Sequence, residues 1–307
     1  MAVNTALIKE LMSLSGAGMM DCKKTLEEAG GDLDEAVKIL REKGKANQEK
    51  KAGRAAAEGL VAVTVEGNKG AIIEVNSETD FVAKNEEFRA FVQNAAKSAL
   101  AASPADLDAL MQASMVGTEF TVEGALQELF LKIRENLKVR RFKLMDGTLF
   151  TYIHNNGEIG VMVNFKTDID PTNPALVECG KNVAMQIAAL GALYLRDTDV
   201  PQEKIDSEKE IAMAQLAEDP KNANKPDAVK AKIAEGKLKK FFSECVLLNQ
   251  AYVKDDKLTV AQYIAGVAKE LGGNIEITEY VRYQKGEGLE KKADNFAEEV
   301  AQLAKGG

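Results

Sequence analysis

Residues 60–83 read LVAVTVEGNKGAIIEVNSETDFVA, and the pattern of this stretch decides the fold. Apolar side chains alternate with other residues at 60–65 and again at 71–75, and residues 67–70, GNKG, separate the two runs. Alternation with a period of two around a short glycine- and asparagine-containing turn is typical of a β-hairpin. We therefore expect an antiparallel hairpin here, followed by a helix that begins near Thr79.

The helix start after this hairpin is the strongest candidate for a contact with another molecule. Thr79 is suited to accept backbone N–H bonds as a helix cap. Asp80 then lies in the first turn, where an acidic charge complements the helix dipole. Phe81 and Val82 can pack into the local core or face a partner, and the residue types alone favour the core.

The hairpin pattern occurs a second time, at residues 149–165. Alternating apolar side chains flank the turn Asn155-Asn156-Gly157 there. One constant shift along the sequence aligns the following pairs: Asn68 with Asn156, Val75 with Val163, Asn76 with Asn164, Thr79 with Thr167, and Asp80 with Asp168. The second copy continues with Ile169, so only the first copy contains the Asp-Phe pair.

This repeat predicts an α+β protein whose core consists of two related halves. Each half should contain a three-stranded antiparallel sheet, with the third strand at residues 137–144 in one and at 274–284 in the other. A helix should follow each hairpin, one beginning after the cap Asn85 and one spanning residues 174–195. Two more helices are expected in the first half, at residues 105–115 and 122–136.

The first part of the chain has helical periodicity that glycine interrupts. We expect three short helices, separated at Gly16-Ala17-Gly18 and at Gly30-Gly31, with Asp32 or Asp34 as the cap of the third. In outline this arrangement resembles a ubiquitin-associated domain. Residues 43–54 are rich in lysine, glycine and alanine, and we expect them to form a solvated linker to the core.

Two charged helices interrupt the second half, at residues 202–217 and 228–247. A short polar connection joins them, which predicts an antiparallel helical hairpin that projects from the body. This arm can be a solvated surface feature, or it can serve docking or a homodimer, and both interpretations stay open. A short amphipathic helix at residues 292–305, with Phe296 on its apolar side, is expected to end the chain.

These patterns divide the chain into five parts. A three-helix domain as small as the first is only marginally stable alone. The predicted parts are a ubiquitin-associated-like helical domain with its linker at 1–54, core half one at 55–145, core half two at 146–200 and 246–285, the inserted helical hairpin at 201–245, and a C-terminal module at 286–307.

The composition argues against an enzyme and against nucleic-acid binding. The 307 residues include one histidine, His154, no tryptophan and three cysteines, and the chain has no P-loop motif. We therefore expect no catalytic triad, no metal site, no disulfide framework, no directly bound nucleotide and no other cofactor. The net charge of −8 lacks the basic character that phosphate backbones require.

The sequence gives no sign of membrane insertion or export. No apolar run approaches the roughly 20 residues of a membrane-spanning helix. The first residues, MAVNT, lack the basic and apolar regions of a secretory signal. We therefore expect a cytosolic, cytoplasmic protein without a membrane partner.

Long motifs make the sequence similar, over nearly its whole length, to bacterial translation elongation factor Ts. The most specific are GAGMMDCKK at residues 16–24 and EVNSETDFVAK at residues 74–84. Shorter blocks agree in order, namely RRF at 140–142, Tyr152 and His154 with IGV at 159–161, KIAEGKLKKF at 232–241, TV at 259–260 and GEGLEKK at 286–292. Two departures are Arg134, where the family usually has glycine, and a longer loop at 219–226.

The resemblance implies a guanine-nucleotide exchange factor for the GTPase elongation factor Tu, acting without covalent chemistry of its own. It implies that Asp80 and Phe81, flanked by Thr79 and Val82, insert near the magnesium and phosphate site of the GTPase. It also implies contacts from the N-terminal domain, the second core half and the C-terminal helix. The residues concerned are Leu11, Met12, Met19, Met20, His154 and Phe296.

Two other functions are compatible with parts of the sequence. An adaptor could use residues 1–46 to bind ubiquitin-like proteins, but the duplicated core would then have no role. An enzyme could use His154, and substitution of that histidine would then abolish its activity. Without the resemblance, the residues indicate only a modular protein that interacts with other proteins.

Overall fold

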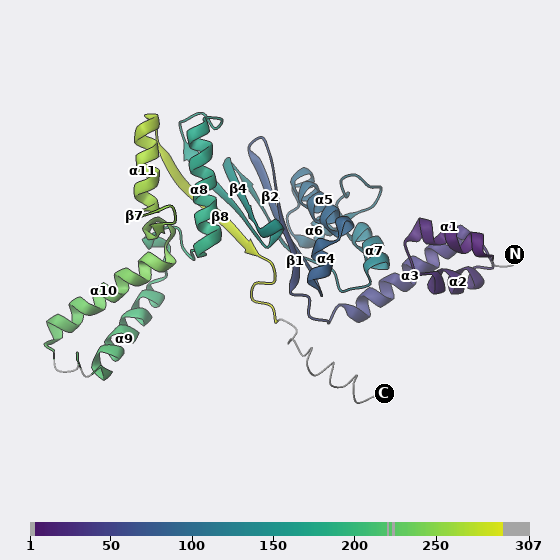
Figure 1. The fold of residues 1–307 in the computed structure, drawn as a ribbon, viewed down its shortest axis with the longest axis horizontal. Helices are drawn as coiled ribbons and strands as arrows, with labels where there is room; N and C mark the ends of the chain where they lie inside the picture. The colour runs from purple at the N-terminus through teal and green to yellow at the C-terminus, as the bar shows by residue number, and fades with distance from the viewer. Residues whose placement is uncertain (1–3, 220, 223–224, 291–307) are drawn as a thin grey trace.

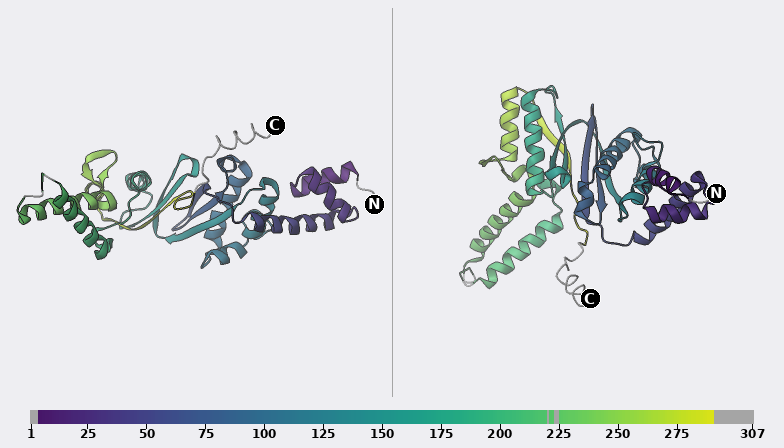
Figure 2. Two further views of the ribbon diagram at one scale, coloured as in Figure 1. Left: turned by 90° about the horizontal axis from the view of Figure 1, so that it is seen from below. Right: turned by 45° about the vertical axis from the view of Figure 1, so that its right-hand side comes forward.

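The computed structural model describes residues 4–219, 221–222 and 225–290 of the chain. The molecule is elongated, with a helical unit at the N-terminal end, two sheets in the middle and a helical arm at the other end (Figure 1). Two further views show the same order of parts along the long axis (Figure 2). In the described part of the chain, no helix is both long enough and apolar enough to cross a bilayer.

The N-terminal unit consists of α1 (Thr5–Ser15), α2 (Met19–Glu28) and α3 (Leu33–Lys51). Its small core contains Leu11, Cys22 and Leu26, all fully buried. Gly16 ends α1 in the left-handed conformation that glycine adopts without strain. Asp32 accepts a hydrogen bond of 2.9 Å from the backbone of Glu35, so the predicted cap of the third helix is confirmed.

Most of the predicted solvated linker at residues 43–54 is helical, and most of its side chains are exposed. Helix α3 continues to Lys51, and its last turn carries Lys50 and Lys51, whose charges favour a helix C-terminus. Gly44 lies near the start of the segment and packs against the side chain of Leu131, where a Cβ atom would overlap it. This glycine of the predicted linker therefore serves close packing between α3 and α7 (Val122–Ile133).

The first sheet has the order β1-β2-β3, and every pairing is antiparallel. The predicted hairpin at residues 60–75 is therefore confirmed. Helices cover one face of this sheet and share a large apolar core with it (Figure 1). Asn85 caps α5 by accepting a 3.0 Å hydrogen bond from the backbone N–H of Phe88, as predicted. The elements are β1 (Glu58–Glu66), β2 (Lys69–Ser77), β3 (Lys138–Asp146), α4 (Asp80–Lys84), α5 (Glu86–Ala102), α6 (Leu107–Gln112) and α7 (Val122–Ile133).

The second sheet repeats this topology, with the order β4-β5-β8 and antiparallel pairing. A hairpin with a third strand beside its second member therefore occurs twice. The helix predicted at residues 174–195 ends earlier, because Gly191 adopts the left-handed conformation after Leu190. A short strand pair and one helix were not predicted. The elements are β4 (Thr148–His154), β5 (Ile159–Thr167), β8 (Ile275–Gln284), α8 (Pro174–Leu190), β6 (Ala251–Tyr252), β7 (Asp255–Thr259) and α11 (Val260–Leu271).

The two sheets pack against each other through a separate apolar cluster. Its buried members are Val61 and Ile72 from the first sheet, Met162 from the second, and Met145 at the end of β3. Gly160 lies at this contact, where a Cβ atom would stand 2.5 Å from the side chain of Val61. The close approach of the two sheets joins the two halves into one body.

The helical arm consists of α9 (Gln202–Glu218) and α10 (Asp227–Cys245), which form an antiparallel hairpin as predicted. Ala212, Leu216 and Ala234 pack between the helices. The arm extends away from the sheets (Figure 1). All three cysteines are buried and free. The predicted C-terminal helix and Phe296 lie outside the described residues.

Candidate partner-binding site

The projecting loop, residues 78–85 between β2 and α5, contains two apolar neighbours that lie in opposite environments. The side chain of Phe81 is 76% exposed, whereas Val82 is only 6% exposed and belongs to the core of the first half. Successive residues of a helix point about 100° apart, which allows one to face the core while the next faces solvent. The residue types favoured burial for both side chains, and this expectation is wrong for Phe81.

Thr79 precedes α4, but its side chain does not cap the helix as predicted. Its hydroxyl instead donates a 2.8 Å hydrogen bond to Oε1 of Glu135, and its backbone N–H donates one of 3.0 Å to Oε2. A carboxylate is a stronger acceptor for the hydroxyl proton than a neutral group. The start of α4 is therefore fixed by the residue that follows α7 by two positions.

A second carboxylate secures the same loop. Glu78 Oε1 accepts a 2.7 Å hydrogen bond from the backbone of Asn136, and Glu78 Oε2 lies 3.5 Å from Arg54. The amide of Asn136 donates to the carbonyl groups of Ala52 and Arg54. Two segments that are distant in sequence, residues 52–54 and 135–136, thus hold the base of the loop, while Phe81 projects from it.

Asp80 supplies a charge beside the exposed ring. Its carboxylate accepts a 2.8 Å hydrogen bond from Lys84, whose Nζ also lies 5.5 Å from the centroid of Phe81. This hydrogen bond holds the pKa of Asp80 below its ordinary value, and the charge of Lys285 contributes in the same direction. The site therefore presents an ionised carboxylate next to an apolar ring.

The corresponding aspartate of the second half has a different role. Asp168 accepts hydrogen bonds of 2.6 Å and 2.9 Å from the backbone and side chain of Asn274. The following residue, Ile169, packs against the core of the second half. Asp168 and Ile169 therefore serve the fold, and the second half has a partly buried isoleucine at the position where the first half has the exposed ring of Phe81.

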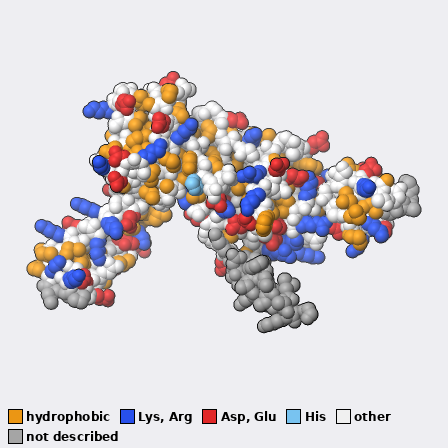
Figure 3. All heavy atoms as spheres, viewed as in Figure 1, with side chains coloured by type: hydrophobic (Ala, Val, Ile, Leu, Met, Phe, Trp, Pro, Cys, Tyr) orange, Lys and Arg blue, Asp and Glu red, His pale blue; other side chains and the backbone are white. Residues whose placement is uncertain are grey.

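Some of the partner contacts predicted in the N-terminal unit are exposed, and others are buried. Met19 and Met20, at the start of α2, are 56% and 61% exposed, and Met12 is partly buried. Leu11 is fully buried in the core of the unit, so its side chain has no surface for a partner. Leu14, which was not among the predicted contact residues, is also largely exposed. Hydrophobic side chains are visible on this unit in Figure 3.

His154 ends β4 on the second sheet and is exposed to solvent. Its Nδ1 lies 3.2 Å from the hydroxyl oxygen of Tyr152. Within residues 4–219, 221–222 and 225–290, no three His, Cys, Asp or Glu side chains gather as metal ligands would.

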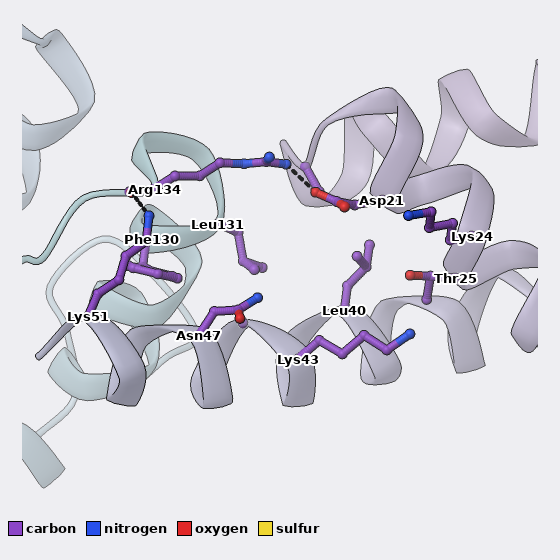
Figure 4. A pocket seen from close by; sticks show the side chains of 12 residues that line it. Asp21, Lys24, Thr25, Leu40, Lys43, Asn47, Lys51, Phe130, Leu131 and Arg134 are labelled. Atoms are coloured by element: carbon purple, nitrogen blue, oxygen red, sulfur yellow. Dashed lines mark hydrogen bonds and ion pairs between the residues drawn. The ribbon is translucent and has the colours of Figure 1, made fainter. Parts of the chain in front are cut away.

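The N-terminal unit meets the first half around a cavity of about 400 Å³ (Figure 4). Arg134, after α7, reaches across to the carboxylate of Asp21, and Lys51 donates to the carbonyl of Arg134. Arg134 has a φ of 61° and ends α7 in the left-handed conformation. Arg134 and its neighbour Glu135 thus connect Asp21, beside Met20, with Thr79, beside Asp80.

Comparison with known proteins identifies the family. The family model described as "Elongation factor TS" matches residues 78–287. Elongation factor Ts of Syntrophotalea carbinolica is 44% identical over 99% of this chain and 100% of its own. The chain belongs to the elongation factor Ts family. Elongation factor Ts of Clostridium perfringens is 44% identical over 98% of this chain and 99% of its own, and that of Clostridium acetobutylicum 43% identical over 97% of each.

Membership of the elongation factor Ts family places the chain among the factors of translation elongation. The match to the family model begins at Glu78 and so includes the projecting loop. The relatives also align with the N-terminal unit, since they cover nearly the whole chain. Sequence reasoning missed the role of Glu135, because nothing local to residues 134–136 indicates that this carboxylate reaches Thr79.

Proposed function

We propose that the chain is a guanine-nucleotide exchange factor that binds the GTPase elongation factor Tu and promotes the release of GDP. The observation that carries this proposal is the exposed ring of Phe81 on a loop anchored by Glu135 and Glu78. An exposed aromatic side chain on a rigid base loses little conformational entropy when it binds. Family membership supports the choice of partner.

In this proposal Phe81 enters between elements of the GTPase near its magnesium and phosphate site. Asp80 is the polar member of the pair and competes for groups that hold the ion or the diphosphate. A P-loop GTPase binds its nucleotide through backbone N–H groups, a lysine and magnesium, so a small displacement of these groups weakens the nucleotide. The exchange factor itself forms and breaks no covalent bond.

Linkage explains why binding alone is sufficient. A factor that binds the nucleotide-free GTPase more tightly than the GDP-bound form must weaken GDP by the same ratio. If release is to become about 10⁴-fold faster, the barrier must fall by about 5.5 kcal/mol. Burial of one phenylalanine contributes roughly 1.5 to 3 kcal/mol. The loop therefore directs the distortion, and other contacts must supply the rest.

These further contacts are proposed for three places on the chain. Met12, Met19 and Met20 form the contact of the N-terminal unit, supported from beneath by Leu11. Methionine suits such a surface because its side chain is flexible and polarizable. His154 belongs to the contact of the second half, and Phe296 to that of the C-terminal module. Thr79 and Val82 act by anchoring the loop that carries Asp80 and Phe81.

The division into domains is part of the same proposal. The parts are the ubiquitin-associated-like domain at 1–54, the two halves at 55–145 and at 146–200 with 246–285, the arm at 201–245 and the C-terminal module at 286–307. Separate apolar clusters in the N-terminal unit, the two halves and the arm support it. A homodimer through the arm stays a proposal, and sedimentation of the chain with and without residues 201–245 tests it.

The decisive experiment measures the release of a fluorescent GDP analogue from purified elongation factor Tu. Release should accelerate with increasing concentration of this chain and reach a plateau. The proposal fails if the wild-type chain at micromolar concentration leaves the release rate unchanged. A pull-down with ubiquitin-like proteins tests the adaptor function, for which no capture is expected.

A further inference from the structure

Two sequence motifs outside the projecting loop meet at one buried carboxylate, Glu74. This residue lies on β2, five positions before Thr79, and its side chain is 0% exposed. Arg140 Nη1 lies 3.0 Å from Oε1, and Arg141 Nε lies 2.6 Å from Oε2. Both arginines belong to β3, the neighbouring strand, and to the RRF motif at residues 140–142.

A β-bulge explains how two consecutive arginines reach the same carboxylate. Neighbouring residues of a regular strand point to opposite faces of the sheet. In the pairing of β2 with β3, Glu74 is opposite Arg141, but Val75 is opposite Val139, so Arg140 has no partner in the register. The extra residue of a bulge changes the direction of the side chains around it. Both guanidinium groups can therefore reach Glu74.

The second motif, residues 286–288, closes the site from the C-terminal side. The backbone N–H of Gly286 donates a 2.8 Å hydrogen bond to Oε1 of Glu74. Arg140 donates to the carbonyl of Glu287 at 2.6 Å, and Arg141 donates to its carboxylate at 3.3 Å. Gly286 has a φ of 67°, and a Cβ atom there would overlap the carbonyl oxygen of Ala57. This turn therefore requires glycine.

The Glu74 carboxylate remains ionised within this site. Burial alone raises the pKa of a carboxyl group, but the hydrogen bonds from Asn76, Gly286, Arg140 and Arg141 outweigh burial and lower it. A buried charge without such partners is strongly unfavourable. The carboxylate and the turn at residues 284–287 therefore depend on each other.

The turn lies next to the strand ends that carry the projecting loop. Lys285 lies 2.7 Å from Glu58 of β1 and 3.2 Å from Glu158, which precedes β5. Glu58 is the register partner of Ser77, the last residue of β2. The charge of Lys285 also reaches Asp80. Figure 1 shows the chain after β8 passing the end of β1.

We infer that Glu74 is a positioning residue that fixes the segment at residues 284–290 relative to Asp80 and Phe81. The inference rests on the proposed exchange function, because it assigns Glu74 a role in binding the GTPase. Through Gly286 and the two arginines, Glu74 sets the position of the turn at residues 284–287. A partner that contacts the loop and residues 284–290 at once then meets both at a fixed separation.

The test compares Glu74→Gln with Val163→Ala in the full-length chain. Val163 is fully buried in the second half, so its truncation destabilises the fold without touching the Glu74 site. Hydrogen exchange of the peptide spanning residues 284–290 should become about tenfold faster or more in Glu74→Gln, through local opening, and stay unchanged in Val163→Ala. If hydrogen exchange of this peptide in Glu74→Gln is as slow as in the wild-type chain, the inference is overturned.

The second part of the test measures GDP release from elongation factor Tu against the concentration of each variant. Glu74→Gln should raise the half-saturating concentration roughly tenfold with a maximal rate within about twofold of wild type, because pre-organisation affects binding. A half-saturating concentration equal to that of wild type overturns the role in binding. If the wild-type chain itself is inactive, the proposed function fails, and hydrogen exchange still decides whether Glu74 positions the segment.

Gly286→Ala is the second variant, for the case that Glu74→Gln does not fold. It alters the turn by contact with Ala57 and leaves the β2 core unchanged. It should reproduce both effects, faster hydrogen exchange at residues 284–290 and a higher half-saturating concentration. Wild-type behaviour of Gly286→Ala in both measurements contradicts the inference.

Discussion

Glu135 accepts two hydrogen bonds from Thr79, one from the hydroxyl group at 2.8 Å and one from the backbone N–H at 3.0 Å. The two residues are far apart in sequence, and their contact joins the end of α7 to the start of α4. Each hydrogen bond to a charged acceptor contributes roughly 1.5 to 3 kcal/mol. The contact therefore limits the conformations of the loop that presents Asp80 and Phe81.

The first prediction concerns this pair. Thr79→Ala and Glu135→Ala should each slow the stimulated release of GDP, since a mobile loop loses more entropy on binding. Thr79→Ala removes only the hydroxyl bond, whereas Glu135→Ala removes both bonds, so the double variant should be hardly worse than Glu135→Ala alone. A double-mutant cycle on the release rate measures the coupling. Full additivity of the two effects contradicts the proposed anchoring role.

The second prediction concerns Phe81. Its ring is 76% exposed, so Phe81→Ala should change the free energy of unfolding by no more than about 0.5 kcal/mol. Stimulated GDP release should nevertheless fall roughly 10- to 100-fold, as the loss of one buried aromatic contact predicts. Release kinetics and urea unfolding together check both statements.

A matched control for Phe81 is Leu193, another large apolar side chain that is 71% exposed. Leu193→Ala removes a similar amount of exposed apolar surface outside the loop, so its release rate should equal that of wild type. If Phe81→Ala and Leu193→Ala slow release equally, exposed apolar area in general, and not the Asp-Phe pair, accounts for the effect.

The sequence predicted those features that depend on neighbours along the chain. Both sheet hairpins follow from period-two alternation around short turns, and the Asn85 cap follows from its position before an apolar stripe. Helix α11 could have been found in the same way. Thr259 and Gln262 form a capping box there, a signal that is visible in the sequence.

Features that depend on distant contacts could not be predicted in this way. The exposure of Phe81, the acceptor of Thr79 and the full burial of Leu11 depend on how elements pack together. The close packing of Gly44 against Leu131 likewise joins two helices that are distant in sequence. The convergence of Arg140, Arg141 and Gly286 on Glu74 requires three separate segments to meet.

The third prediction concerns Arg134, which ends α7 with a φ of 61°. A non-glycine residue in the left-handed conformation costs about 1 kcal/mol or more. Its ion pair with Asp21 is half exposed and contributes only about 0 to 1 kcal/mol. Arg134→Gly should therefore leave the melting temperature unchanged or raise it slightly in a thermal unfolding experiment.

Asp21→Asn separates the two contributions of Arg134. It removes the ion pair but keeps the left-handed arginine, so it should lower stability by no more than about 1 kcal/mol. If Arg134→Gly destabilises the chain far more than Asp21→Asn, the contact between the N-terminal unit and the first half depends on Arg134 in a way that the ion pair does not explain.

The last prediction concerns the pH dependence of folding at Glu74. Its hydrogen bonds lower the folded-state pKa below the ordinary value of 4.5. The unfolded chain therefore binds a proton at higher pH than the folded chain does, and stability falls as the pH decreases. The stabilisation is complete above pH 4.5, and it is lost as the pH falls from there through the lower folded-state pKa.

Glutamine does not titrate, so the stability of Glu74→Gln should fall less steeply in this range. Urea unfolding of both chains between pH 7 and pH 3 measures this difference, and the other carboxyl groups cancel because both chains contain them. Parallel acid slopes in the two chains are incompatible with an ionised, hydrogen-bonded Glu74.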